Sequence, residues 1–162
     1  MVFIDWLTNA CMELTKIRSV ALQVAAHLKN KRYPEAFSLA EEFVTNYPKE
    51  VVAHFMFAKS AFWVGKYTKA EEEGLRAFNL AHDSYEMSIC AVITASAMYM
   101  QKEFRAGYML LSGVKLEGNE NVIKLLMIFS IVLNNPANAE FYYGELTKIS
   151  QSVADDFLVR LS

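Results

Sequence analysis

Arg32-Tyr33-Pro34-Glu35-Ala36 and Lys66-Tyr67-Thr68-Lys69-Ala70 decide the fold, because the two stretches match when the chain is slid against itself by 34 residues. Tyr33 aligns with Tyr67, and Ala36 aligns with Ala70. Both stretches lie in regions whose apolar residues recur with the spacing of a helix. A self-match at this period is typical of arrays in which each repeat is a helix, a turn and a second helix. The sequence therefore predicts a stack of helix pairs.

The composition supports an all-helical domain. The 162 residues are 54% hydrophobic and 13% aromatic, with only 6 glycines and 3 prolines. This composition excludes disorder and argues against a β protein rich in turns. No run of alternating apolar and polar residues is bounded by turn signals, so no strand is expected.

The second copy of the repeat shows the expected unit most clearly. A helix over 51–64, a turn at Gly65-Lys66 and a helix over 68–81 form one pair. Glycine permits a tight turn because it has no Cβ to restrict its backbone. These residues resemble the tetratricopeptide (TPR) pattern at its own spacing. The resemblance implies an all-α fold, a right-handed superhelical solenoid of TPR-like antiparallel helix pairs.

The TPR resemblance also gives individual residues a role. It implies that Tyr67 fills the wedge between two helices, and that Ala70 and Ala77 are small because helix backbones approach closely there. Lys31 stands in the glycine position of the preceding copy, and Phe43 in its second small position. The positions that carry the resemblance over the three copies are Tyr33, Ala36, Pro48, Gly65, Tyr67, Ala70, Ala77, Phe104 and Gly107.

We expect a single TPR-like domain over residues 1–162. Its clearest repeats lie at about 17–50 and 51–84, with divergent repeats at 84–118 and 119–150 and a closing helix at 152–161. A separate helix is expected before them, over about 2–16. Its apolar face would be formed by Phe3, Leu7, Ala10 and Leu14.

Signatures of catalysis are missing from the sequence. It has no glycine-rich phosphate loop, no G-x-S-x-G and no H-E-x-x-H, so we expect no enzyme and no cofactor. The three histidines, His27, His54 and His82, are not helical neighbours, and no metal site is expected. Glu71-Glu72-Glu73 is interpreted as a solvated outer face, because consecutive helical residues point in different directions.

The remaining composition bears on compartment and partners. Cys11 and Cys90 are far apart and have no C-x-x-C spacing, so both are interpreted as small buried hydrophobic residues in a reducing, cytoplasmic or nuclear compartment. The start of the chain does not resemble a secretory signal, and the longest uncharged stretch, 87–101, is short for a membrane span. The formal net charge is −2, and no basic stripe is interleaved with aromatics, so no nucleic-acid partner is expected. Four methionines are expected to fill the core: Met87, Met98, Met100 and Met109.

In a TPR array the first helix of each pair lines the concave surface. By that resemblance, the partner-binding groove is formed by Phe55, Lys59, Phe62, Ile89, Val92, Ser96 and Tyr99, with Ala21, Ala25 and Leu28 from the first repeat. This lining is largely apolar and suits an amphipathic helix or an extended hydrophobic segment of another protein. Two alternatives remain open: one of the chain's own terminal helices fills the groove, or two copies of the chain form a homodimer.

Two families within the superfamily offer a further resemblance. Residues 33–42, YPEAFSLAEE, followed by 55–67, resemble the N-terminal TPR region of anaphase-promoting-complex scaffold subunits, which pairs two copies of the subunit. The length of the chain resembles that of the small TPR chaperones of type III secretion. We therefore expect a non-enzymatic protein–protein interaction module, a scaffold or adaptor. The alternative is a chaperone that sequesters a hydrophobic segment of a secreted or assembling subunit.

Overall fold

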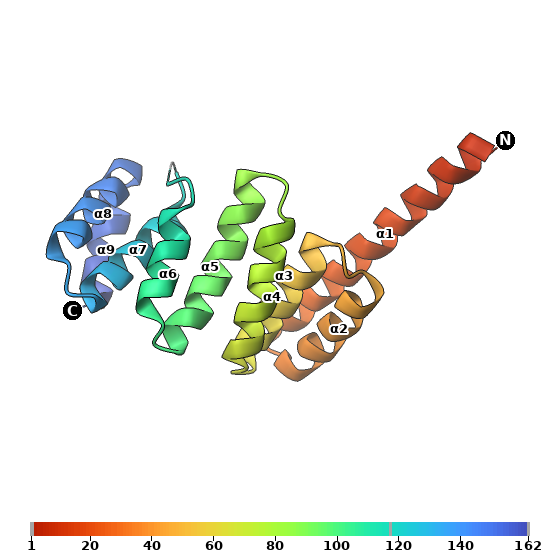
Figure 1. The fold of residues 1–162 in the computed structure, drawn as a ribbon, viewed down its shortest axis with the longest axis horizontal. Coiled ribbons are helices and arrows are strands. Elements are labelled where there is room, and N and C mark those ends of the chain that lie inside the picture. The colour runs from red at the N-terminus through yellow and green to blue at the C-terminus, as the bar shows by residue number, and fades with distance from the viewer. Residues whose placement is uncertain (1, 117, 162) are drawn as a thin grey trace. The chain divides into compact units, whose positions relative to one another are not determined.

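The computed structural model describes residues 2–116 and 118–161, with side chains from residue 10 onward. Over these residues the chain forms helices and no strand, as the sequence predicts (Figure 1). The helices are α1 (Val2–Lys29), α2 (Tyr33–Asn46), α3 (Val51–Trp63), α4 (Tyr67–Leu80), α5 (Ser84–Met100), α6 (Phe104–Ser112), α7 (Glu120–Val132), α8 (Pro136–Ile149) and α9 (Gln151–Leu161). No described helix combines the length and the hydropathy needed to cross a membrane.

The helices form two compact units, Met1–Leu80 and Ala81–Ser162. In the first unit α1 packs on α2 and α3, α2 packs on α3, and α3 packs on α4. In the second unit each helix from α5 to α9 packs on the next, and α5 also packs on α7. Each unit is therefore a stack of consecutive helix pairs.

The four turns inside the pairs have the same hydrogen bonds. In the first, the Lys31 N–H donates to the Leu28 carbonyl (3.0 Å) and the Arg32 N–H donates to the His27 carbonyl (2.9 Å). This is the pattern of a Schellman motif, which needs one residue in the left-handed conformation. The residues in that conformation are Lys31 (φ 58°), Gly65 (φ 79°), Lys102 (φ 65°) and Asn134 (φ 55°). The prediction that Lys31 occupies the position of Gly65 is confirmed.

The positions predicted to be small lie where helices approach closely. Ala36, Ala70 and Ala77 are fully buried. A Cβ added to Gly107 would lie 2.4 Å from Cζ of Phe129, which packs α6 against α7 with no room for a side chain. Phe43, in the second small position of the first copy, is also buried and packs with Ala21 and Ala53.

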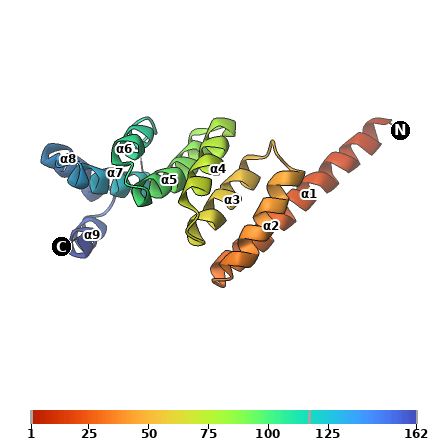
Figure 2. The ribbon, with the colours of Figure 1, turned by 60° about the horizontal axis from the view of Figure 1, so that its bottom comes forward.

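The first helix differs from the prediction. The sequence suggested a break near residue 16, but α1 runs without interruption from Val2 to Lys29. No glycine or proline stands between these ends to stop it. Figures 1 and 2 both show the N-terminal part of α1 extending beyond the helices that pack on it. Leu14 in that part is 66% exposed, whereas the side chains of Phe3 and Leu7 lie outside those described.

Some predictions for the core were wrong. Met98 and Cys90 are buried as expected, but Met100 and Met109 are exposed on their helices and Cys11 is exposed on α1. Cys11 is exposed because it lies in the part of α1 that extends past α2. Ala21 and Leu28, which were expected in the groove, instead pack in the core of the first unit.

Candidate protein-interaction surface

Two first helices, α3 and α5, are apolar around most of their circumference. In α3, Lys59 is the only lysine, arginine, aspartate or glutamate, and in α5 Glu86 is the only one. The second helix α4 is different, with Lys69, three consecutive glutamates and Arg76. A helix that is apolar on all sides is normally covered on all sides. Parts of α3 and α5 are nevertheless only half-buried, and each helix offers a candidate surface within its own unit.

In the first unit, the three predicted groove residues lie on α3 and are half-buried. The Lys59 ammonium lies 6.0 Å from the centroid of the Phe55 ring. Phe62 contacts Tyr67 edge to face, with ring centroids 5.5 Å apart, and contacts Trp63 in the same way at 5.8 Å. Phe55 and Lys59 thus contact each other, whereas Phe62 supports the wedge between α3 and α4.

In the second unit, the four predicted residues lie on α5 and are also half-buried. The Ser96 hydroxyl donates to the Val92 carbonyl (2.7 Å), so it is satisfied within its helix. Tyr99 packs against Phe104 and Phe129, with ring centroids 5.4 and 5.8 Å away. Ile89 and Val92 are consequently the members of this set without a role in ring packing.

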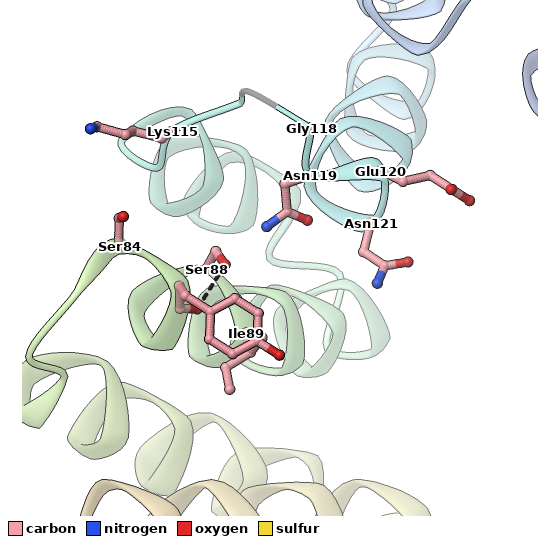
Figure 3. Close-up of a pocket in the computed structure, with 9 residues that line it drawn as sticks. Ser84, Ser88, Ile89, Lys115, Gly118, Asn119, Glu120 and Asn121 are labelled. Atoms are coloured by element: carbon pink, nitrogen blue, oxygen red, sulfur yellow. Dashed lines mark hydrogen bonds between the residues drawn. The ribbon is translucent and has the colours of Figure 1, made fainter. Parts of the chain in front are cut away.

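A pocket of about 580 Å³ lies beside Ile89, between the start of α5 and the start of α7 (Figure 3). The Asn119 side chain points across it toward α5, whereas Lys115 extends away from it. The Asn119 oxygen accepts from the Val122 N–H (3.2 Å) and caps α7. Serine hydroxyls, an amide and the Ile89 side chain are thus gathered at one end of the α5 face. The pocket is lined by Ser84, Tyr85, Ser88, Ile89, Lys115, Gly118, Asn119, Glu120 and Asn121.

A buried ion pair in the first unit was missed by the sequence analysis. His54 Nδ1 lies 2.6 Å from Oε2 of Glu73, and both side chains are almost fully buried. The other oxygen of Glu73 contacts the Lys69 ammonium and the Arg76 guanidinium, each at 3.0 Å. The interpretation of residues 71–73 as a solvated face is therefore wrong for Glu73. Because the three point in different directions, one of them faces the core, where α3 supplies its partner.

The partners of Glu73 favour its ionised form. His54 Nε2 lies 2.9 Å from the Pro48 carbonyl, which can only accept. Burial by itself raises the pKa of the Glu73 carboxyl, but the hydrogen bond from His54 and the contacts with Lys69 and Arg76 outweigh it and hold the pKa below its ordinary 4.5. The two ring nitrogens of His54 thus face a carboxylate oxygen and a backbone carbonyl oxygen. The pair joins α3 to α4 and has no access to a substrate.

The described residues offer little for chemistry elsewhere. Among them, no three His, Cys, Asp or Glu side chains gather so as to hold a metal ion. Burial, with a smaller contribution from Glu86, raises the pKa of the Cys90 thiol to about 12, so this thiol is unreactive near neutral pH.

Comparisons with known proteins bear on the fold. No protein-family model matches the chain, and no curated protein matches it. Among solved structures, it is similar to the one titled "Functional Characterization of Pseudomonas Aeruginosa pilF", with a TM-score of 0.62 and 18% sequence identity over 89% of this chain. The match spans 66% of that protein, so this chain covers just under two thirds of it. Such an identity bears on the fold and not on the function.

The fold is TPR-like. The 34-residue self-match, the four Schellman turns and the small buried residues are the local features that produce it. A second solved structure, TTC0263, described as a thermophilic TPR protein of Thermus thermophilus, is similar at a TM-score of 0.46 and 13% identity, over 89% of this chain and 96% of that one.

Proposed function

We propose that this TPR-like chain is a non-enzymatic interaction module, a scaffold or adaptor, that binds a helix or an extended hydrophobic segment of another protein. The observation that carries the proposal is the apolar character of α3 and α5 on their half-buried sides. In the first unit Phe55 would be covered by apolar side chains of a partner and Lys59 would pair with an acidic one, and in the second unit Val92 would be covered in the same way. The polar pocket beside Ile89 would receive backbone groups of the bound segment, which amides and hydroxyls can satisfy. The two unpaired cysteines support a reducing compartment, cytoplasmic or nuclear.

The test is site-specific photocrosslinking in the cells that make the protein. Benzoylphenylalanine would replace Phe55 or Val92, and the matched control would carry it at Glu41, which is exposed on the second helix α2. We expect one defined crosslinked protein from the first two positions and not from the third. Crosslinking at Glu41 alone, or at none of the three positions, would contradict the proposal.

A second candidate is the chaperone, because the chain exposes many large apolar side chains. Those at least 60% exposed are Leu14, Leu22, Tyr85, Met109 and Val159. Apolar surface of this kind is covered by a client, by a second copy of the chain, or not at all. Size exclusion with light scattering on the chain expressed alone distinguishes these cases. Aggregation that a co-expressed client relieves would favour the chaperone, a stable dimer would favour self-association, and a clean monomer would favour the adaptor.

A further inference from the structure

We propose that one end of the first unit is a second interaction surface, separate from the α3 face, and that it binds a short acidic segment of a partner protein. Four cations and two aromatic rings form this basic edge: Lys29, Lys31, Arg32, Lys66, Tyr33 and Trp63. The α1–α2 and α3–α4 turns that carry them lie at the same end of the helices in Figures 1 and 2.

A ring stack holds the two turns together. The rings of Tyr33, at the start of α2, and Trp63, at the end of α3, are stacked with centroids 5.4 Å apart and planes 8° apart. The Lys66 ammonium lies 4.1 Å from the centroid of the Phe37 ring, one turn further along α2. Lys66 therefore lies beside the residues that follow Arg32, and the cations of the two turns share one edge.

The cations on this edge are not neutralised by the fold. Lys29, Lys31 and Arg32 are exposed and make no ion pair with any described residue, and the acid nearest to them in sequence is Glu35. The chain as a whole has a formal net charge of −2, so without these four cations it would carry −6. The edge is thus a basic region on an acidic protein, and such a region attracts a ligand of opposite charge.

Lys31, in the α1–α2 turn, also supports the view that this edge is a basic binding surface. Lys31 is in the left-handed conformation, where a residue with a side chain is disfavoured and glycine is not. Its ammonium forms no ion pair with a described residue that would compensate for this. A lysine at this position adds a charge to the edge instead.

The small number of rings and cations on the basic edge favours an acidic peptide over a nucleic acid as its ligand. The stack covers one face of each ring, and Trp63 is still 51% exposed. Single-stranded nucleic acid needs a row of open rings and a cationic track along its backbone. The edge has four cations, and the acidic remainder of the chain would repel a longer polyanion. The basic edge is matched by a segment with a few Asp or Glu residues and one apolar residue that packs on the exposed part of Trp63.

The probe is a dye-labelled peptide in which four glutamates surround one phenylalanine. Its binding would be measured by fluorescence anisotropy, and by Trp63 emission in a Trp6→Phe background that leaves one tryptophan. The test variant is Lys31→Glu/Arg32→Glu. The matched control is Arg18→Glu/Lys49→Glu, which changes the net charge equally at exposed positions of the same unit.

We expect the test variant to bind the peptide at least tenfold more weakly than the wild type, and the control variant to bind within twofold of it. Binding should weaken with added salt, and Trp63→Ala should weaken it while circular dichroism stays unchanged. A peptide with glutamine in place of glutamate that binds equally well would overturn the proposal. So would equal losses in both variants, tighter binding of a ten-residue thymidine oligonucleotide, or no binding of the peptide at millimolar concentration.

Discussion

Glu73 shows how one side chain can decide the stability of a helix pair. It is almost fully buried and is held by His54, Lys69 and Arg76. Removing one partner of a buried ion pair leaves the other uncompensated. We expect Glu73→Gln to lower the free energy of unfolding by about 3 kcal/mol at pH 7 in urea denaturation. Glu72→Gln, one residue away and exposed, is the matched control and should be nearly neutral.

The difference in unfolding free energy between the wild type and Glu73→Gln should depend on pH with a defined sign. The pKa of Glu73 is lowered in the folded chain, so its ionised form contributes stability above the ordinary value of 4.5, and this contribution is lost as the pH falls through the lowered pKa. The gap between wild type and Glu73→Gln should therefore be constant from pH 7 to about 5.5 and narrow below 4.5. A gap that widens in acid would show that another group dominates.

Gly107 differs from Glu73 in that it stabilises the packing of its helix by having no side chain. A Cβ would lie 2.4 and 2.9 Å from two atoms of the buried Phe129 ring. We expect Gly107→Ala to destabilise the chain by about 1–3 kcal/mol in urea denaturation. Gly144→Ala is the control, since nothing lies within 4 Å of its added Cβ and alanine favours a helix. Equal effects of the two changes would mean that α6 can move away from α7.

At the scale of the element, substitutions in two equivalent turns should change the melting temperature in opposite directions. Gly65 and Lys102 occupy the same position in their turns, both in the left-handed conformation. A side chain costs about 1 kcal/mol or more there, and glycine does not. Gly65→Ala should therefore lower the melting temperature and Lys102→Gly should raise it, as measured by circular dichroism. Two changes of the same sign would contradict the equivalence of the turns.

The helix pairs could be predicted because their signals are local. The turn position of Gly65 and the small size of Ala70 depend on residues a few places away, and the sequence shows them directly. The break predicted inside α1 came from extending the 34-residue period to a region without glycine or proline. The burial of Glu73 could not be predicted, because its partner His54 lies 19 residues away on another helix and a run of three acids usually faces water.

The residues of the candidate surfaces could be predicted from the sequence only in part. That α3 and α5 carry apolar residues all round is visible in the sequence. Which of these residues a neighbouring ring covers is a tertiary property. Phe62 and Tyr99 were predicted alongside Phe55 and Val92, but they pack against aromatic rings of their own units. The stack of Tyr33 on Trp63 joins two turns through residues 30 apart, and no local pattern reveals it.

At the scale of the molecule, the two units should respond separately to a core mutation. In arrays of this kind stability is a sum over repeats and their interfaces, so damage stays local. Leu126 is fully buried in the second unit, and Leu126→Ala should cost about 2–5 kcal/mol there. We expect faster native-state hydrogen exchange in α5 to α8 and unchanged exchange in α2 to α4.

The reciprocal variant is the control for this experiment. Phe43 is buried in the first unit, and Phe43→Ala should speed exchange in α2 and α3 while leaving α7 and α8 protected. If either variant accelerated exchange in both units to the same degree, the chain would unfold as one cooperative body.

The packing of each helix mainly on its neighbours in sequence has a mechanical consequence. Under a pulling force applied to the two ends of such a chain, the load reaches one helix interface at a time. A sheet pulled along its strands breaks many hydrogen bonds together, whereas this chain should lengthen in small steps at low force. Each released pair keeps its turn residues and most of its contacts close in sequence, so it should reform quickly when the tension falls. Low resistance to extension and fast recovery are therefore the mechanical behaviour expected of this packing.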